Sequence, residues 1–234
     1  MTREPIGQTT YNRIGDRFAD EVDNRPYNAL FERPATLALV GEVAGKHILD
    51  MGCGNGWYSE TLRDRGATVV AFDVSETMLY RAKERLGKTV PLFHQSLDRP
   101  YDFAHDAEFD LVIAPLCLSY VPDLRPVYHE VARVLKPGGA FVFSTHHPAN
   151  DYSRHSEGDY HETRLLTERW SWLGEMQFYR RPLQEILDPL WEAGLILERF
   201  VEAIPTEEFA RLQPESFAKE KRSPSFVCLR VLRR

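Results

Sequence analysis

The sequence predicts an α/β protein with a mostly parallel sheet, and three features indicate this fold. Between residues 47 and 145, apolar runs of strand length alternate with segments of helical periodicity. Two of these runs end in an acidic residue, Asp50 and Asp73. A glycine-rich turn at residues 52–56, GCGNG, directly follows the first run. Strands that alternate with helices pair in parallel through right-handed crossovers, so their carboxyl ends should meet on one side of the sheet.

Composition and charge narrow the class of protein. With 234 residues, 43% hydrophobic and 27% charged, the chain has the composition of a soluble globular protein and suits a single domain over residues 1–234. The formal net charge of −6 argues against a nucleic-acid partner, because phosphate binding requires clustered Lys and Arg. We interpret the short basic runs, Arg180-Arg181 and residues 219–222, as solvent-exposed charges. No apolar segment near the start predicts a signal peptide or membrane span, so we expect a cytoplasmic protein without a membrane partner.

Residues 1–45 precede the first strand and are expected to form a helical arm. The segment holds Tyr11, Phe18, Tyr27 and Phe31 among charged residues, and Pro34 is placed to open a helix over residues 35–43. Such an arm either covers a bound ligand or packs on the sheet, and the sequence leaves both roles open.

The turn at residues 52–56 suits close contact between the backbone and a ligand. Glycine lacks a Cβ atom, so it permits a tight turn and lets the main chain approach a ligand. The helix expected from Trp57 to Arg65 would point its free N–H groups at the same place. Asp73 lies about twenty residues beyond the turn, where nucleotide-binding folds place a carboxylate for ribose hydroxyls.

The remaining elements follow in order. Ser75 caps a helix through Leu86, and apolar runs at 90–94, 111–114 and 140–145 predict the third, fourth and fifth strands. After residue 182, we expect a helix over 183–193 and two last strands over 195–201 and 226–232, the latter at the edge of the sheet. Residues 146–182 are polar, rich in aromatic side chains and too long for an ordinary loop, which predicts an inserted lid.

Four segments resemble the class I S-adenosylmethionine (SAM) dependent methyltransferases, specifically the small-molecule type 11 group. They read LDMGCGNG (49–56), VVAFDVSETML (69–79), FDLVIAPLCLSYVPD (109–123) and VARVLKPGGAFVFST (131–145). A nicotinamide dehydrogenase would share the first two features, but its turn reads G-x-G-x-x-G and it has no counterpart to the KPGG turn at 136–139. The resemblance implies a Rossmann-like, seven-stranded, mostly parallel sheet with helices on both faces and an antiparallel edge strand.

The resemblance also implies SAM as the cofactor and assigns its parts to residues of this chain. Asp50 would bind the methionyl ammonium through water or backbone, and Asp73 would accept hydrogen bonds from both ribose hydroxyls. The rest of the cofactor would lie along Gly52, Cys53, Gly54 and Ala114 at the methionine portion, and along Val74 and Met78 at the adenine.

Three of these assignments are open to question. Many relatives carry an Asp at the end of the third strand, whereas this chain has Gln95 followed by Ser96. The Gln95 amide oxygen can still accept from an adenine amine, and the Ser96 N–H can serve a ring nitrogen. Met78 fits the helix core equally well, and Cys53 is interpreted as a small filler in the turn, ahead of a nucleophile. The three cysteines lack C-x-x-C spacing, so we expect no disulfide framework.

The implied activity is methyl transfer to an oxygen or nitrogen atom of a small, planar metabolite. His146 and His147 lie just past the fifth strand, and a histidine titrates near neutrality, so either could take the acceptor's proton. We favour His147 over His146, and the alternative is that they shape the turn before Pro148. No carboxylate spacing accompanies these or the later histidines, so we expect no metal.

Flat side chains of the lid predict a slot for a planar acceptor, since aromatic rings bury much area at low conformational cost. The predicted acceptor residues are Tyr11, Tyr152, Tyr160, Trp170, Trp172 and, for an acidic group on the acceptor, Arg181. Alternatively, the rings form the lid's own core. Two other functions stay open: a SAM-binding regulatory protein without transfer activity, and a protein or nucleic-acid methyltransferase. A homodimer is also left open.

Overall fold

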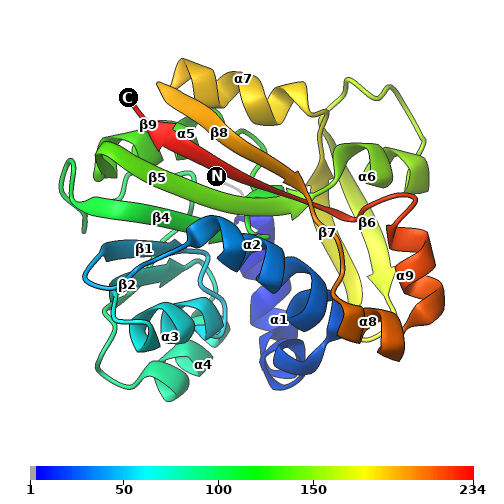
Figure 1. Cartoon of the computed structure of the whole chain (residues 1–234), viewed down its shortest axis with the longest axis horizontal. Helices are drawn as coiled ribbons and strands as arrows, with labels where there is room; N and C mark the ends of the chain where they lie inside the picture. The colour runs from blue at the N-terminus through cyan, green and yellow to red at the C-terminus, as the bar shows by residue number, and fades with distance from the viewer. Residues whose placement is uncertain (1–3) are drawn as a thin grey trace.

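Seven strands form the central sheet, and the structure, a computed structural model, describes residues 4–234 (Figure 1). The strand order is β3-β2-β1-β4-β5-β9-β8. Five strands pair in parallel: β1 (His47–Met51), β2 (Thr68–Asp73), β3 (Leu92–His94), β4 (Phe109–Pro115) and β5 (Leu135–His146). The chain then adds β9 (Phe226–Arg233), antiparallel to both β5 and the outermost strand, β8 (Leu195–Glu202). The mostly parallel sheet predicted from the alternation of strands and helices is therefore confirmed, and β9 lies one place in from the edge.

Strands β3 and β5 begin at other residues than the sequence predicts, for identifiable reasons. β3 begins at Leu92 and not at residue 90, because Pro91 has no N–H to donate to a ladder and only accepts from Ala71. β5 begins at Leu135 and not at residue 140, because Leu135 already pairs with Phe109 before an irregularity in the register.

Helices cover both faces of the sheet and enclose two apolar cores. On one face lie α5 (Arg125–Val134) and α7 (Gln184–Glu192), and on the other lie α2 (Arg33–Val40), α3 (Trp57–Asp64) and α4 (Glu76–Leu86). Because side chains alternate along a strand, each strand supplies both cores. In β4, for example, Val112 belongs to the core beneath α5, and Ile113 belongs to the core beneath α3.

The arm consists of α1 (Ile6–Glu21), a short 3₁₀ turn (Val22–Asn24) and a π-helical turn (Asn28–Glu32) that runs into α2. α1 packs closely on α4, since a Cβ atom built on Gly15 would lie 2.8 Å from Thr77 Cγ2. α2 ends at Val40 and not at residue 43, because Gly41 adopts a φ of 71°.

Residues 146–182 form a helix and a hairpin. After α6 (Pro148–Arg154), β6 (Arg164–Trp170) and β7 (Gly174–Arg180) pair antiparallel as a separate sheet. Figure 1 shows this hairpin beyond the carboxyl ends of the parallel strands, near α8 (Glu207–Leu212) and α9 (Pro214–Glu220). Its turn packs on α1 through a small apolar cluster that includes Ile14, Leu173 and Met176.

Candidate active site

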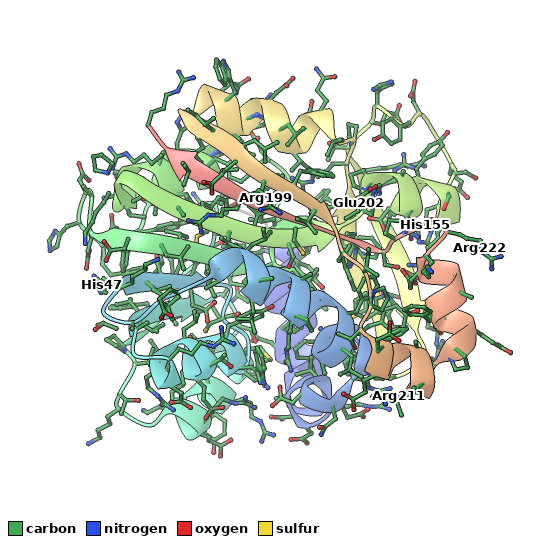
Figure 2. All side chains as sticks on the ribbon, viewed as in Figure 1. His47, His155, Arg199, Glu202, Arg211 and Arg222 are labelled. Atoms are coloured by element: carbon green, nitrogen blue, oxygen red, sulfur yellow. The ribbon has the colours of Figure 1, made fainter. Side chains whose placement is uncertain are left out.

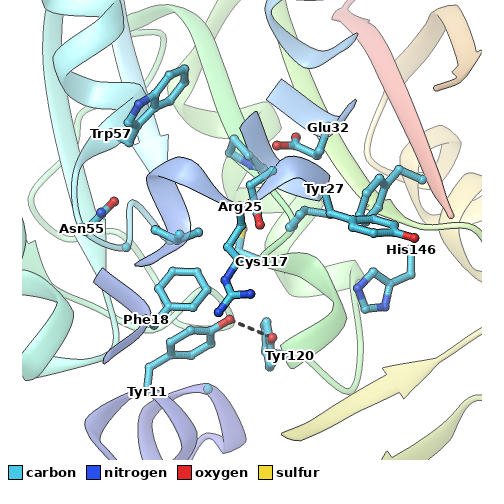
Figure 3. A pocket seen from close by; sticks show the side chains of 18 of the residues that line it. Tyr11, Phe18, Arg25, Tyr27, Glu32, Asn55, Trp57, Cys117, Tyr120 and His146 are labelled. Atoms are coloured by element: carbon cyan, nitrogen blue, oxygen red, sulfur yellow. Dashed lines mark hydrogen bonds between the residues drawn. The ribbon is translucent and has the colours of Figure 1, made fainter. Parts of the chain in front are cut away.

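A cavity of about 720 Å³ lies beyond the carboxyl ends of the parallel strands, between the arm and the β6–β7 hairpin (Figure 3). Cavities that bind small ligands in proteins measure about 300–1,000 Å³, so this one has an ordinary size for a cofactor site. Its walls come from α1 and the π-helical turn, from the turns after β1, β2 and β4, and from α6 and the hairpin turn.

The structure brings most of the sequence-predicted residues to this cavity. The lining includes Asp50, Gly52, Cys53, Gly54, Asp73, Val74, Met78, Gln95, Tyr11, Trp170, Trp172 and His146. The side chains of the other predicted residues have other surroundings: Ser96, Ala114, His147, Tyr152, Tyr160 and Arg181.

The turn after β1 requires glycine at positions 52 and 54. Gly52 and Gly54 have φ values of 63° and 55°, a region that residues with a side chain rarely adopt. A Cβ atom on Gly52 would also lie 2.6 Å from Cys117 Cβ. The Gly54 N–H donates to Asp73 Oδ2 at 2.9 Å, and the Ser75 N–H donates to Asp73 Oδ1 at 2.8 Å. These two bonds fix the Asp73 carboxylate at the cavity wall, and each oxygen keeps a lone pair for a ligand hydroxyl.

Asp50 lines the cavity and holds one buried oxygen without a hydrogen-bond partner among residues 4–234. Its Oδ2 atom accepts from the Ser59 hydroxyl at 2.6 Å, whereas Oδ1 has no hydrogen-bond partner among residues 4–234. The residue is fully buried, and burial raises its pKa to about 7, with the nearby Asp73 charge adding to the rise. A buried carboxylate oxygen without a donor is costly, so this site suits a ligand that brings a cation or a donor.

The part of the cavity next to the turn after β2 has apolar walls and one amide oxygen that is free to accept a hydrogen bond. Phe72 and Leu97 line it beside Val74 and Met78. Gln95 donates its side-chain amide to the Ser96 carbonyl at 2.9 Å, which leaves its Oε1 atom to accept from a ligand.

Two predicted cofactor residues lie differently from the expectation. The Ser96 side chain turns to Asp98, so only its backbone remains for a ligand. Ala114 is fully buried in the core beneath α5, because alternation along β4 points it away from the cavity. Leu116 and Cys117, which follow it, line the cavity instead.

Cys53 is a buried thiol. Burial raises its pKa well above the ordinary value, and the nearby Asp73 and Asp50 charges raise it further. The thiol therefore stays protonated near neutral pH, which suits a filler of the turn better than a nucleophile.

The two histidines after β5 have different surroundings, and only His146 lines the cavity. His147 caps α6, since its Nδ1 accepts from the Ala149 N–H, and its Nε2 lies 3.0 Å from an oxygen of Glu202. Figure 2 labels Glu202, which belongs to β8. His146 lines the cavity, and its Nδ1 lies 3.6 Å from Asp151 Oδ2. The chain places His146, and not His147, where it could meet an acceptor.

The two tryptophans of the hairpin lie against the arm. The Trp172 ring stacks on Phe18 at 5.8 Å, and the Arg25 guanidinium lies 4.3 Å from its centroid. The Trp170 indole N–H donates to Glu168 at 3.2 Å. Both rings line the cavity and contribute to the apolar cluster between the hairpin and α1. They therefore form part of the cavity wall and part of the core of the lid.

The predicted slot residues Tyr152 and Tyr160 hold a loop instead. The two rings meet edge to face at 5.5 Å, the Leu183 N–H donates to the Tyr160 hydroxyl, and Arg180 lies over the Tyr152 ring at 4.9 Å. Both rings lie outside the lining because the hairpin, and not this loop, faces the cavity.

Arg180 and Arg181 were expected to be exposed, and that prediction is wrong. Only 1% of Arg180 and 6% of Arg181 is exposed. Arg180 donates to the carbonyls of His155 and Asp159, at 2.6 and 2.9 Å, and Arg181 donates to the carbonyl of Val121. Backbone carbonyls therefore take these guanidinium groups, and Arg181 is not available for an acidic group on an acceptor.

Tyr120, Glu32 and Asp151 are among the lining residues that the sequence did not predict. Tyr120 donates or accepts a 2.9 Å hydrogen bond with Tyr11, which Figure 3 marks with a dashed line. Glu32, only 1% exposed, accepts from the hydroxyls of Ser144, Thr36 and Tyr58 at 2.6, 2.6 and 2.9 Å, and burial raises its pKa.

The third is Asp151, which is 5% exposed and faces His146. An acid directly after the apolar run ALF at 29–31 was the available signal for Glu32, and an acid soon after Pro148 was the signal for Asp151.

Two kinds of feature are absent from residues 4–234. No group of three or more His, Cys, Asp or Glu side chains is arranged to hold a metal ion. No helix in this range has the length and apolar character that crossing a bilayer requires.

Comparisons with known proteins agree with this geometry. Residues 49–143 match the family model described as a methyltransferase domain. Two ubiquinone biosynthesis O-methyltransferases, of Thiobacillus denitrificans and Aromatoleum aromaticum, are 42% and 38% identical over 106 and 152 residues. The matches cover 44% and 62% of this chain, which spans 45% and 64% of the length of these relatives.

A solved structure agrees over more of the chain. The S-adenosylmethionine dependent methyltransferase of Mesorhizobium loti is 27% identical with a TM-score of 0.72, covering 91% of this chain and 100% of its own. The sheet order, the glycine turn and the two strand-end acids define a class I methyltransferase fold. Residues 49–143 thus match a methyltransferase domain, and the chain has the fold of a SAM-dependent methyltransferase.

Proposed function

We propose that this chain transfers the methyl group of SAM to an oxygen or nitrogen atom of a small, flat metabolite. The observation that carries the proposal is the unpaired, buried Asp50 Oδ1 atom at a glycine turn whose backbone borders the cavity. When bound, SAM supplies an electrophilic methyl group on a sulfonium. The protein's own residues then bind, orient and desolvate the reactants.

The cofactor half of the cavity has a partner for each polar part of SAM. Asp50 Oδ1 would take the methionyl ammonium, and the Asp73 carboxylate would accept from the ribose hydroxyls. Gln95 Oε1 would accept from the adenine amine between the apolar side chains of Phe72 and Leu97. This match in donors and acceptors supports SAM as the ligand.

The acceptor half begins at His146. Asp151 lies beside His146 Nδ1, so it would hold the proton on that nitrogen and leave Nε2 to accept a proton from the acceptor. Methyl transfer is an in-line displacement, so alignment of the acceptor by the surrounding rings would supply much of the rate. Tyr27, Trp170 and Phe226 line this half and suit a flat molecule.

The size of the cavity supports a small acceptor over a macromolecule. His146 lines a cavity of about 720 Å³, which is an ordinary volume for a small-molecule site. The names of the curated relatives, O-methyltransferases of ubiquinone biosynthesis, also support a small-molecule acceptor.

The test is transfer of a labelled methyl group. The protein is incubated with methyl-labelled SAM and a metabolite extract, and label in small molecules is separated from label in protein. We expect label in small molecules, and loss of most of it in the His146→Ala variant. A protein that binds SAM but transfers no label to any extract would be a SAM-binding protein without this activity, and the proposal would fail.

A further inference from the structure

We infer that the methyl acceptor carries a basic nitrogen, an amine or amidine on a flat apolar body, and that Asp151 recognises its charge with the help of Glu32. The inference rests on the proposed function, because it concerns the acceptor half of the same cavity.

Asp151 is a buried carboxylate without a hydrogen-bond partner. It lies on α6, lines the cavity and is 5% exposed. Among residues 4–234, no donor makes a hydrogen bond with either of its oxygens, and its nearest ionisable contact is His146 Nδ1 at 3.6 Å from Oδ2. Buried carboxylates in proteins are almost always paired, so this one indicates a ligand that supplies a cation or a strong donor.

Glu32 adds a second carboxylate near the same place. It contacts the Ser144 side chain, and Ser144 and His146 point to the same face of β5 because they are two residues apart. Two residues along a strand span about 7 Å. The two acids therefore contact neighbouring positions of one strand face, Glu32 at Ser144 and Asp151 at His146.

The arginines of the lining do not offset these acids. Arg25, Arg33 and Arg154 each line the cavity, and each already pairs with a carboxylate: Glu21, Asp23 and Glu168 respectively. The remaining arginine of the lining, Arg169, is solvent-exposed. An anionic acceptor would thus meet three arginines that are already paired and one exposed arginine, whereas a cation would meet two buried acids, Asp151 and Glu32, that form no ion pair with an arginine among residues 4–234.

The same arrangement suits the chemistry of an amine. A protonated amine has no free electron pair, so it must lose a proton before it can attack. That proton would go to His146 Nε2, while Asp151 holds a remaining N–H of the acceptor. The freed pair forms the new N–C bond, and the electrons of the broken C–S bond stay on sulfur as a neutral thioether.

The test compares three probes that share a phenyl ring and a short chain: 2-phenylethylamine, 2-phenylethanol and 3-phenylpropionate. Calorimetry measures their binding to protein saturated with S-adenosylhomocysteine. A hydrogen bond to a charged group contributes about 1.5–3 kcal/mol, so we expect the amine to bind roughly ten- to a hundredfold more tightly than the alcohol. We expect the acid to bind most weakly.

The isosteric variant Asp151→Asn isolates the charge. We expect it to reduce the advantage of the amine over the alcohol to less than about threefold, which corresponds to under 1 kcal/mol. The matched control is Asp102→Asn, which removes the same charge from an exposed position outside the cavity and should leave the preference intact. Thermal melting confirms that each variant is folded. Glu32→Gln is a second variant, which removes the charge of the assisting acid and is measured with the same three probes.

The outcomes separate this inference from the proposed function. Equal or absent binding of the three probes, tighter binding of the alcohol or acid, or a preference that survives Asp151→Asn would overturn the inference. Binding of S-adenosylhomocysteine in the first titration tests the cofactor half independently. If the homocysteine derivative binds and the amine shows no advantage, only the acceptor class is wrong.

Discussion

At the residue scale, the cofactor half of the site depends on two acids with different surroundings. Asp73 has two backbone donors and is fixed in place, whereas Asp50 keeps one oxygen without a partner. The first is prepared to accept hydrogen bonds from neutral hydroxyls, and the second to meet a cation. Each predicts a different response to mutation or pH.

Replacing Asp73 by alanine should weaken SAM binding strongly. The change removes the acceptors for the ribose hydroxyls, and hydrogen bonds to a charged group contribute about 1.5–3 kcal/mol, which is roughly ten- to a hundredfold in affinity. Calorimetry measures this directly. An affinity within about twofold of the parent would mean that Asp73 does not hold the ribose.

Cofactor affinity should fall as the pH is lowered through 7. Burial raises the pKa of Asp50 to about 7, so below that pH the free protein carries this group protonated and neutral. Because an ammonium binds the ionised form, each pH unit below the pKa should weaken binding by up to about tenfold. Calorimetry with S-adenosylhomocysteine between pH 5.5 and 8 measures the slope. Asp50→Asn should bind weakly at every pH, and an unchanged slope in this variant would contradict the assignment.

The two adjacent histidines offer a matched pair of variants. His146→Ala should slow turnover by about 10²–10⁴-fold if His146 is the general base, with SAM affinity nearly unchanged. His147→Ala removes the cap of α6 and should lower stability by about 0.5–2 kcal/mol with little effect on turnover. Turnover and melting temperature of both variants are measured side by side. The reverse pattern would return the catalytic role to His147.

At the element scale, the arm and the hairpin meet over the cavity through Trp172, Phe18 and Arg25. Trp172→Ala should raise KM for the acceptor while SAM affinity is largely preserved, because the change removes one aromatic wall of the cavity. Tyr152→Ala is the control, since Tyr152 supports a loop outside the cavity and its loss should lower only the melting temperature. Equal effects of the two substitutions on KM would contradict this division of roles.

The elements that the sequence predicts well are those with local signals. The glycine turn follows from residues within one short segment, and Ser75 caps α4 through its hydroxyl, as predicted. The hairpin β6–β7 has no such signal. Its strands are joined at Trp170–Gly174, and its position depends on packing against α1, far away in the sequence. The aromatic-rich segment therefore predicts that a lid is present, but it does not predict which helices and strands form the lid.

Buried charges are the other group that sequence patterns miss. Glu32 accepts hydrogen bonds from hydroxyl groups at positions 36, 58 and 144, and the last two positions lie far away in the chain. Arginine is usually exposed in proteins, yet carbonyls of the loop at 155–159 accept hydrogen bonds from the Arg180 guanidinium. In both cases, the partners come together only in the folded chain, so spacing along the sequence does not predict them.

At the scale of the whole molecule, the sheet brings separate parts of the chain to one cavity. The parallel strands end on one side, where β1 and β2 provide the acids and β5 provides His146. The arm, α6 and the hairpin, which lie outside the matched residues 49–143, supply Glu32, Asp151 and Trp172 respectively. The cofactor half is thus made by the part shared with relatives, and the acceptor half largely by the segments that flank it.

A crystal structure with S-adenosylhomocysteine bound tests the central claim most directly. We predict that the ribose hydroxyls contact Asp73, that the ammonium contacts Asp50 Oδ1, and that the sulfur faces His146 across the acceptor half. A ligand bound outside this cavity, or bound in it with the sulfur turned away from His146, would contradict the account.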